Sequence, residues 1–414
     1  MKIVIPMKKG ASDVIWECVI VGAGASGLYA AAQLEMQNVL VLEKKHRAGL
    51  KLGVSGGGQC NLTHEGYAKD FFDHYGAHKS FVKHALKAHD ASAVRQFFKH
   101  LGVETVTRED GKIFPADFRA RSVIRSLINR IENLGHVIQY QQRVTEVAQW
   151  SNGFLIKTKD AVYHSKRVII ATGGQSYPSL GSEGDGYALA EMLHLPLTAV
   201  APGLTGILCS DKALAALSGV GLSAINMVHY PSQKQYTGDL LITHFGLSGP
   251  VIINNSRDFK AGDRLGVNWL GEDPGKVQQR IKSIIEANGG QHLRYLLNQF
   301  ELPDRLKSLI ISRMAMDEQR RLAEFSRENR QQLMTWLTAY PIAIKKLQGY
   351  DTAMVTVGGI ATTAISSKTM AAKNVDNLYI VGELMDIDGD TGGYNLQWAF
   401  SSAYAAVQAI LSTI

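Results

Sequence analysis

Short apolar runs, two of them followed directly by glycine, occur in the first half and near the end of the 414-residue chain. Four of these runs read ECVIV, NVLVL, VIIA and NLYIV, at residues 17–21, 38–42, 168–171 and 377–381. Continuous apolar runs of this length are typical of strands that are buried on both faces of a parallel sheet. Helical patterns accompany them at residues 28–34 and 396–410. The two ends of the chain therefore predict one doubly wound α/β domain.

A different pattern occupies the middle of the chain. We expect two amphipathic helices at about residues 78–100 and 119–134. A strand is expected at 139–147, with a hairpin turn at Ser-Asn-Gly (151–153). Short strands separated by Gly, Pro and Ser turns follow from about 197 to 270, and residues 276–347 return to helical periodicity. This pattern predicts a small β domain and a helical segment, both inserted into the α/β domain.

The first predicted strand runs into a glycine turn, GAGASG at residues 22–27. Gly22 permits a tight turn, Gly24 lets the backbone approach a pyrophosphate, and Gly27 lets the helix pack against the strand. The helix N-terminus at Ala25 and Ser26 supplies N–H groups and a positive dipole to the phosphates. Glycines alone would fit a simple tight turn, but strand, glycine turn, helix, strand and acid follow one another within about 30 residues. This order predicts dinucleotide binding.

Two acidic residues refine the choice of dinucleotide. Glu43 ends the second strand, 21 residues after Gly22, where a carboxylate accepts hydrogen bonds from a ribose and disfavours the 2′-phosphate of NADP. Glu383 follows the last strand, where it could accept a hydrogen bond from a ribityl hydroxyl. The glycine-rich sequence DTGGYNLQW (390–398) then opens a helix whose positive end could face a flavin pyrimidine ring. An ordinary glycine-rich helix start is the alternative, but the combination favours FAD over NAD.

Six segments also resemble a known family, the BaiN-like bacterial FAD flavoproteins. They read RAGLK (47–51), SGGGQCN (55–61), ATGGQSYP (171–178), GDG (184–186), THFGLSGP (243–250) and GGYNLQWA (392–399). The resemblance implies bound FAD, a glutathione-reductase-like FAD domain, an inserted β-barrel and a small helical insert. The family includes an aminoacetone oxidase, a bile-acid enone reductase and, more distantly, a ribosomal RNA dihydrouridine synthase. It therefore leaves the substrate open.

The resemblance and the pattern together place the domain boundaries. The FAD-binding domain is expected at 1–196 and 359–414, the β-barrel at 197–270 and 344–358, and the helical insert at 271–343. Arg47 and Lys51 could neutralise the pyrophosphate, and three consecutive glycines could let the backbone pass close to a flat ring. Val144 is expected near adenine by family analogy. The remaining expected flavin contacts are Gly57, Gly58, Gln59, Cys60, Asn61, Thr172, Gly173, Gly393, Asn395 and Leu396.

Three residues are candidates for catalysis. Cys60 could be a proton donor or a redox-active thiol, although a buried cysteine is usually a small apolar residue. His244 precedes a predicted helix start at Ser-Gly-Pro (248–250), which suggests a role near flavin or substrate; a structural role is the alternative. Tyr394 could contact the substrate or merely pack. The three cysteines of the chain, Cys18, Cys60 and Cys209, form neither a disulfide framework nor a zinc spacing, and we expect no metal.

Charge adds a second hypothesis about partners. Lys and Arg (44) exceed Asp and Glu (37) by 7, and residues 276–347 alone hold 13 basic against 7 acidic residues, a net of +6. A solvated helical face is one explanation, and a platform for RNA is the other. No apolar run is long enough to span a membrane, and the start of the chain lacks the apolar core of a signal peptide, so we expect a cytoplasmic protein. Residues 1 to about 14 are expected to be an extension.

These features predict an FAD-dependent oxidoreductase that transfers a hydride equivalent between flavin and a small organic substrate, by C=C reduction or amine oxidation. The chain has no second strand–glycine turn–helix unit with an acid. NADH or NADPH would therefore share the flavin face, or the substrate itself would reduce the flavin. The alternatives are an RNA-acting flavoprotein that reduces uridine in ribosomal RNA, and a flavin-carrying structural or sensor protein. The sequence leaves the oligomeric state open.

Overall fold

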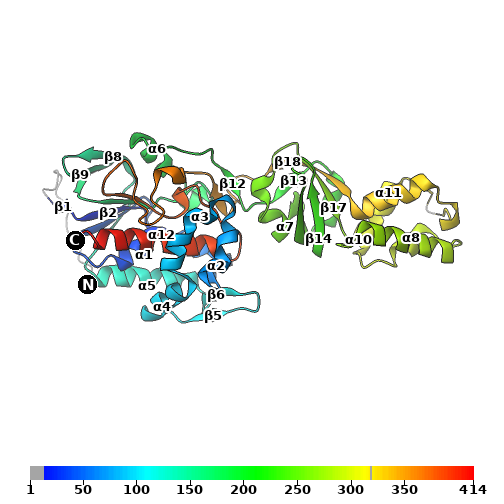
Figure 1. Cartoon of the computed structure of the whole chain (residues 1–414), viewed down its shortest axis with the longest axis horizontal. Coiled ribbons are helices and arrows are strands. Elements are labelled where there is room, and N and C mark those ends of the chain that lie inside the picture. Colours follow the sequence, from blue (N-terminus) through cyan, green and yellow to red (C-terminus); the bar gives the residue numbers. More distant parts are fainter. Residues whose placement is uncertain (1–13, 318) are drawn as a thin grey trace. The chain divides into compact units, whose positions relative to one another are not determined.

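The computed structural model describes residues 14–317 and 319–414, so nearly all of the expected N-terminal extension lies outside the described residues. The chain divides into two compact units (Figure 1). The first unit combines Met1–Gly203 with Tyr350–Ile414, and the second comprises Leu204–Gly349. In sequence, the second unit is therefore an insertion into the first.

A five-stranded parallel sheet forms the centre of the first unit. Its order is β20-β11-β2-β3-β7, so the last strand of the chain pairs with a strand from its first half. Helix α1 contacts β2 and β3 of the sheet, and it packs beside both α5 and α12 (Figure 1). The strands are β20 (Leu378–Ile380), β11 (Val168–Ile170), β2 (Cys18–Val21), β3 (Val39–Glu43) and β7 (Val137–Tyr140). The helices are α1 (Ala25–Gln33), α5 (Ala120–Asn133) and α12 (Tyr394–Leu411).

Three smaller sheets complete the strands of the first unit. One has the order β1-β10-β9-β8, the second β4-β6-β5, and the third pairs β12 with β19. Their strands are β1 (Ile15–Trp16), β10 (Val162–Ser165), β9 (Gly153–Thr158), β8 (Val144–Trp150), β4 (Thr63–His64), β6 (Lys112–Pro115), β5 (Thr105–Thr107), β12 (Ala201–Gly203) and β19 (Val355–Val357). The other α-helices of the unit are α2 (Ala68–Phe71), α3 (Lys79–Ala88), α4 (Ala91–His100) and α6 (Asp185–Met192).

Two predicted elements of this unit are each divided in the structure. The helix expected at 78–100 is α3 followed by α4, because Asp90 caps a new helix by accepting a hydrogen bond from the Ala93 N–H at 3.0 Å. The strand expected at 139–147 is β7 followed by β8, which belong to different sheets. Gln141 between them has a left-handed φ of 59°, so the extended chain ends there. The predicted hairpin turn does connect β8 to β9, with Trp150 opposite Gly153.

A closed six-stranded barrel forms the centre of the second unit, in the order β13-β16-β15-β14-β17-β18. Its strands are β13 (Ile207–Cys209), β16 (Gly246–Ser248), β15 (Lys234–Ile242), β14 (Gly221–His229), β17 (Arg264–Asn268) and β18 (Tyr340–Leu347). Its helices are α7 (Pro250–Ile253), α8 (Pro274–Ala287), α9 (Leu293–Leu297), α10 (Asp304–Met314) and α11 (Arg327–Thr338). The helical periodicity expected to continue to 347 stops earlier, because β18 closes the barrel from Tyr340 onward.

The barrel and its helices share one apolar core. Tyr340 of β18 joins them, since its ring centroid lies 5.2 Å from that of Trp269 and 5.3 Å from that of Trp336 on α11. The observed architecture is the predicted one: a doubly wound α/β unit with an inserted β-barrel and helices. Within the described part of the chain, no helix is both long and apolar enough to traverse a bilayer.

Candidate cofactor and active site

The glycine turn between β2 and α1 has two closed positions and one open position. A Cβ atom on Gly22 (φ +103°) would lie 2.7 Å from the Ala171 carbonyl oxygen, and one on Gly27 would lie 1.9 Å from the Gly22 carbonyl oxygen. A Cβ atom on Gly24 would meet no atom within 4 Å. Packing therefore requires glycine at the first and third positions, while the second leaves space beside the N-terminus of α1. A pyrophosphate needs this arrangement.

Glu43 lies at the end of β3, next to this turn, and is 9% exposed. Its Oε2 accepts a hydrogen bond from the Ala23 N–H at 2.9 Å, and its Oε1 accepts one from the Lys45 N–H at 2.8 Å. The two backbone donors fix the carboxylate in place. Each carboxylate oxygen can accept a further hydrogen bond, so both remain able to bind ribose hydroxyls.

Lys51 and Glu383 form an ion pair, with Lys51 Nζ 2.7 Å from Glu383 Oε2. Glu383 Oε1 accepts hydrogen bonds from Ser176 Oγ and from the Thr356 N–H, both at 2.9 Å. Lys51 also donates to Ser176. The structure thus brings together the residue expected at the pyrophosphate and the residue expected at the ribityl chain. By contrast, Arg47 is exposed.

The glycine-rich segment 55–61 presents bare backbone. Gly56, Gly57 and Gly58 have φ values of 56°, 67° and 87°, and the first two are exposed. The side chain of the next residue, Gln59, accepts a hydrogen bond from Arg108 Nη2 at 2.6 Å. Left-handed glycines leave this stretch of backbone uncovered, so it could lie against a flat ring.

Two buried polar atoms at this end of the sheet have no hydrogen-bond partner among the described residues. They are Asn61 Oδ1 and Thr172 Oγ1. An unsatisfied buried polar atom is costly, which is why such atoms in a native site often belong to a ligand's contacts. Both residues were expected to contact flavin from the sequence. Together with the space at Gly24, they show that the residues present fit an FAD molecule.

The start of α12 is built around Gly393, which has a φ of 105° and whose Cβ position would lie 2.6 Å from the Thr63 backbone. Asn395 turns inward, since its side chain accepts from the Gly389 N–H at 2.8 Å and donates to the Gly389 carbonyl at 2.9 Å. Its amide therefore holds the preceding loop. The next residue, Leu396, is half-buried.

The other expected contacts lie on three different elements of the first unit. Gly173 follows β11 with a φ of 72°. Val144 is buried at the start of β8, opposite Thr158. Ala25 and Ser26 form the first turn of α1, where no side chain caps the helix.

The three catalytic candidates have different surroundings. Cys60 is fully buried, and burial raises its pKa to about 12, so it is a thiol at neutral pH. Tyr394 is 6% exposed, and burial, with a smaller effect of Asp390, raises its pKa to about 12. His244 belongs to the second unit and lies in the turn between β15 and β16.

The helix start predicted at Ser-Gly-Pro (248–250) after His244 is confirmed, but His244 does not lie immediately before it. The strand β16 separates the histidine from the four-residue helix α7, which begins at Pro250 with Gly249 as its N-cap. The imidazole instead stands edge-on to the ring of Phe245, with centroids 5.1 Å apart.

A histidine that sequence reasoning missed stands beside Tyr394. The imidazole of His74 stacks on the Tyr394 ring at a centroid distance of 3.8 Å, and its Nδ1 lies 2.9 Å from Asp390 Oδ2. The two partners are 316 residues apart, so no local spacing could have indicated the pair.

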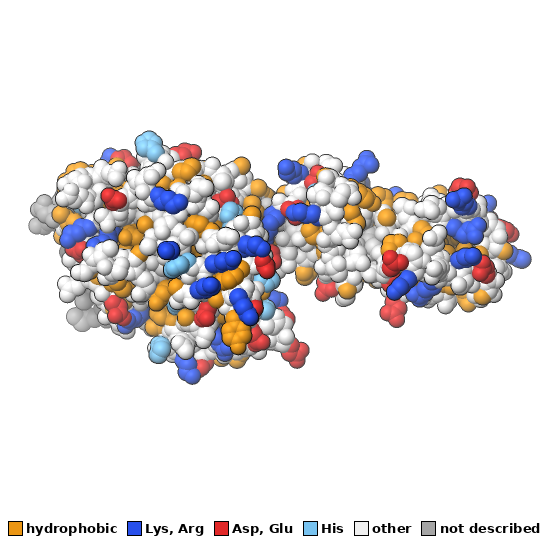
Figure 2. All heavy atoms as spheres, in the orientation of Figure 1, with side chains coloured by type: hydrophobic (Ala, Val, Ile, Leu, Met, Phe, Trp, Pro, Cys, Tyr) orange, Lys and Arg blue, Asp and Glu red, His pale blue; other side chains and the backbone are white. Residues whose placement is uncertain are grey.

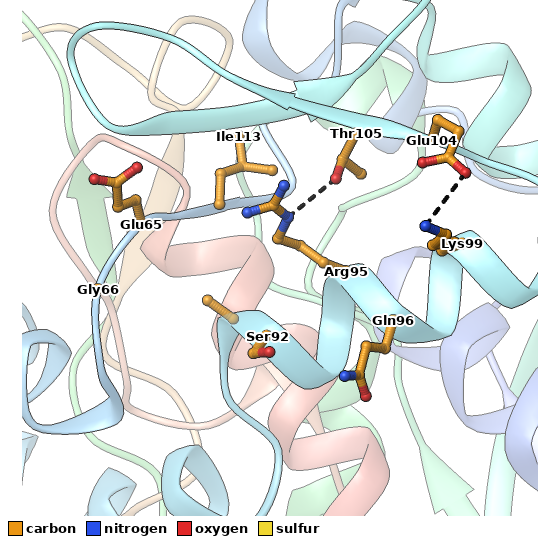
Figure 3. A pocket seen from close by; sticks show the side chains of 10 residues that line it. Glu65, Gly66, Ser92, Arg95, Gln96, Lys99, Glu104, Thr105 and Ile113 are labelled. Carbon is orange, nitrogen blue, oxygen red and sulfur yellow. Dashed lines mark hydrogen bonds and ion pairs between the residues drawn. The ribbon is translucent and has the colours of Figure 1, made fainter.

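A cavity of about 320 Å³ opens elsewhere on the first unit, between α4 and the β4-β6-β5 sheet (Figure 3). Arg95 crosses it and donates to Thr105 Oγ1 at 3.1 Å, while Lys99 and Glu104 form an ion pair of 3.8 Å at its rim (Figure 3). None of the expected FAD contacts lines this cavity. We therefore do not assign it to the cofactor site.

Comparison with known proteins establishes the family. The model of the HI0933-like protein Rossmann domain matches residues 16–409. The chain belongs to the HI0933-like family. Its relatives include a ribosomal RNA dihydrouridine synthase of Haemophilus influenzae, 31% identical over 95% of this chain and 98% of the relative. They also include a 3-dehydro-bile acid delta(4,6)-reductase of Clostridium scindens, 29% identical over 94% of this chain and 98% of the relative.

A solved structure shows the same fold as this HI0933-like chain. It is the 3-ketosteroid delta1-dehydrogenase of Sterolibacterium denitrificans in complex with 1,4-androstadiene-3,17-dione, which has a TM-score of 0.53 and 12% identity. The match covers 97% of this chain and 100% of the other. These comparisons confirm the resemblance inferred from the motifs and the fold class predicted from the pattern.

Proposed function

We propose that this chain, an FAD-dependent oxidoreductase, reduces a C=C bond conjugated to a carbonyl in a small organic substrate. The observation that carries the cofactor is the glycine turn, closed at Gly22 and Gly27 and open at Gly24. The bile-acid reductase, similar along nearly the whole chain, supports C=C reduction over amine oxidation. Amine oxidation is the alternative reaction for the same site.

Residues of the first unit suggest how FAD would be held. The glycine turn and the N-terminus of α1 would bind the pyrophosphate, and Glu43 would accept hydrogen bonds from the adenosine ribose. Lys51 and Glu383 would bind at the other side of the pyrophosphate, where the ribityl chain begins. Bound FAD would supply the two-electron chemistry, and the positive end of α12 would face the pyrimidine ring.

A nicotinamide dinucleotide, NADH or NADPH, would have to reach the flavin face directly, since the sequence has no second glycine-turn unit. Anaerobic mixing of the purified yellow protein with each nucleotide tests this. Bleaching of the flavin absorbance by one of them identifies the donor.

The function itself is tested in half-reactions. The protein is purified, its flavin content is measured, and the flavin is reduced photochemically without oxygen. Conjugated enones are then added, and we expect the oxidised flavin spectrum to return with formation of the saturated ketone. A colourless protein that takes up no FAD would refute the cofactor assignment. Reduction of the oxidised flavin by amines, with no reaction of the reduced flavin with enones, would favour amine oxidation.

A second candidate function is action on RNA. Its support is the relative from Haemophilus influenzae named ribosomal RNA dihydrouridine synthase, together with the basic segment 276–347. Several cations of this segment already have partners in the fold, however. Arg280 lies over the Phe300 ring at 4.4 Å, Arg305 donates to the Ser218 carbonyl at 3.1 Å, and Arg313 pairs with Asp211 at 2.5 Å.

Acidic side chains also lie among the basic ones on the visible face of these helices (Figure 2). The proposal of C=C reduction in a small molecule is therefore preferred. Retardation of ribosomal RNA fragments at low ionic strength would favour the second candidate, since phosphate contacts strengthen as salt falls. Absence of retardation under those conditions would remove it.

A further inference from the structure

A histidine–aspartate pair stands at the start of α12, outside the residues assigned to FAD. His74 lies in the 3₁₀ segment Phe72–His78, and Asp390 lies in the loop before the helix. They meet twice: His74 Nδ1 is 2.9 Å from Asp390 Oδ2, and the Asp390 N–H donates to the His74 carbonyl at 3.0 Å. The backbone hydrogen bond fixes the distance between the two segments. The His74 and Asp390 side chains are therefore kept within contact distance.

The ring of Tyr394 fixes the plane of the imidazole. The His74 and Tyr394 rings are stacked at 3.8 Å with an interplanar angle of 16°. Tyr394 is itself immobilised, because Tyr75 donates a hydrogen bond to its carbonyl at 2.8 Å and Phe71 packs edge-on against its ring. Two contacts therefore orient the imidazole: the Asp390 carboxylate and the Tyr394 ring.

The carboxylate also selects a tautomer. A carboxylate oxygen can only accept, so in the neutral imidazole of His74 the hydrogen lies on Nδ1. Nε2 has no hydrogen bond to any residue that the structure describes. The His74 side chain is 37% exposed, so a small molecule can reach the imidazole. The pair therefore has the two properties of a proton-transfer group: an oriented ring and a free nitrogen.

The other candidates lack one of these properties. Cys60 is fully buried, and Tyr394 is 6% exposed. His64 has both ring nitrogens next to carbonyl oxygens, at 2.9 Å from that of Glu65 and 3.0 Å from that of Asp110. The charged or titratable groups around His74 are Asp390, Tyr394 and Tyr75, with the His78–Asp386 pair (3.6 Å) next along the same segment.

We propose that His74 is the proton donor for the reduction and that Asp390 is its positioning residue. This inference rests on the proposed function, which places the reacting end of the cofactor at the start of α12. One carbon of the substrate C=C bond receives the hydride equivalent. Its neighbour receives the Nε2 proton from the imidazolium form of His74, which carries a hydrogen on each ring nitrogen. The π bond breaks, two C–H bonds form, and the cofactor loses two electrons. The neutral imidazole regains its proton from water.

Three variants of the FAD-loaded protein test this role. Gln at position 74 can occupy the space of the imidazole but cannot transfer a proton, so His74→Gln should slow reoxidation of the reduced flavin by an enone about 100-fold or more. Its flavin content should equal that of the unmodified protein, and its rate should lose the decline at alkaline pH that comes from deprotonation of the donor. Asp390→Asn should slow the reaction less. His78→Gln is the matched control and should retain the rate within about threefold.

A second readout does not depend on turnover. In a long-range ¹H–¹⁵N spectrum of the holoprotein, the neutral form of His74 should show the proton on Nδ1, and Asp390→Asn should shift that signal. A neutral form protonated on Nε2 would overturn the proposal, as would an unchanged rate and pH profile in His74→Gln. If the unmodified protein binds FAD but reacts with no enone, the proposed function fails. In that case the tautomer measurement still decides whether Asp390 orients His74.

Discussion

Lys51 and Glu383 are 332 residues apart in sequence, yet their charged atoms lie 2.7 Å apart. Both side chains are about a quarter exposed, at 25% and 22%. An ion pair with this exposure contributes little to stability, about 1 kcal/mol or less. Stability therefore does not explain the pair. The ion pair instead fixes the positions of a cation, Lys51, and a hydrogen-bond acceptor, Glu383, where the first and last parts of the chain meet.

We predict that Lys51→Met weakens FAD binding about tenfold while leaving the free energy of unfolding within about 1 kcal/mol. The positive charge expected at the pyrophosphate is lost, whereas Glu383 keeps its hydrogen bonds from Ser176 and Thr356. Quenching of flavin fluorescence on titration of the apoprotein measures the affinity. Lys166→Met is the control, because Lys166 pairs with Glu17 at 2.5 Å on a more exposed surface. Equal losses in the two variants would contradict the prediction.

The glycine turn offers a comparison of the same added methyl group at two positions. Gly24→Ala should bind FAD at least about tenfold more weakly with little change in stability, because its methyl would enter the open space. Gly27→Ala should lower the free energy of unfolding by about 1–3 kcal/mol or more, because its Cβ would lie 1.9 Å from the Gly22 carbonyl oxygen. Thermal unfolding of the apoprotein and FAD titration separate the effects. Strong destabilisation by Gly24→Ala would show that the space is not a ligand site.

Local patterns accounted for the parallel sheet and for the glycine turn. Buried parallel strands are continuous apolar runs, and the turn carries its chemistry within six residues, so both can be read without knowing the fold. The barrel strands were harder to delimit. Tyr340 follows a helical segment directly, and only its pairing with Val267 of β17 makes it part of a strand.

Contacts between distant segments could not be predicted. Nothing near His74 in sequence indicates Asp390, and nothing near Lys51 indicates Glu383. His244 illustrates the converse. Ser-Gly-Pro does begin a helix, as its residue types predict, but the three residues before Gly249 pair as β16, so the histidine lies in the turn before that strand. Whether a segment forms a strand or a turn at such positions depends on which strands complete the sheet, and strand pairing is decided by the whole unit.

Cys60 should be unreactive in the folded protein. Burial raises its pKa to about 12, and thiolate is the reactive form, so at pH 8 its alkylation should be at least about a thousandfold slower than in urea. Mass spectrometry of the Cys60 peptide after iodoacetamide treatment measures the rate. The buried Cys18, whose pKa is also raised to about 12, is an internal comparison. Rapid labelling of Cys60 alone would show that the glycine-rich segment 55–61 opens in solution.

The pH dependence of stability should show the burial of His89. Burial lowers its pKa to about 4, and Nε2 is 2.6 Å from the hydroxyl of Tyr29. In the unfolded chain His89 binds a proton as the pH falls through about 6.5, whereas in the folded chain it stays neutral. The contribution of neutral His89 to the free energy of unfolding is therefore fully present above about pH 6.5. It should fall by about 3 kcal/mol as the pH drops towards 4. Glu183, whose pKa is lowered to about 2 chiefly by Arg143, loses its contribution only below about pH 4.5. Urea unfolding at several pH values measures this effect. Between about pH 6.5 and 4, the free energy of unfolding should depend less on pH in His89→Gln than in the exposed control His100→Gln. Parallel curves for the two variants would contradict this assignment.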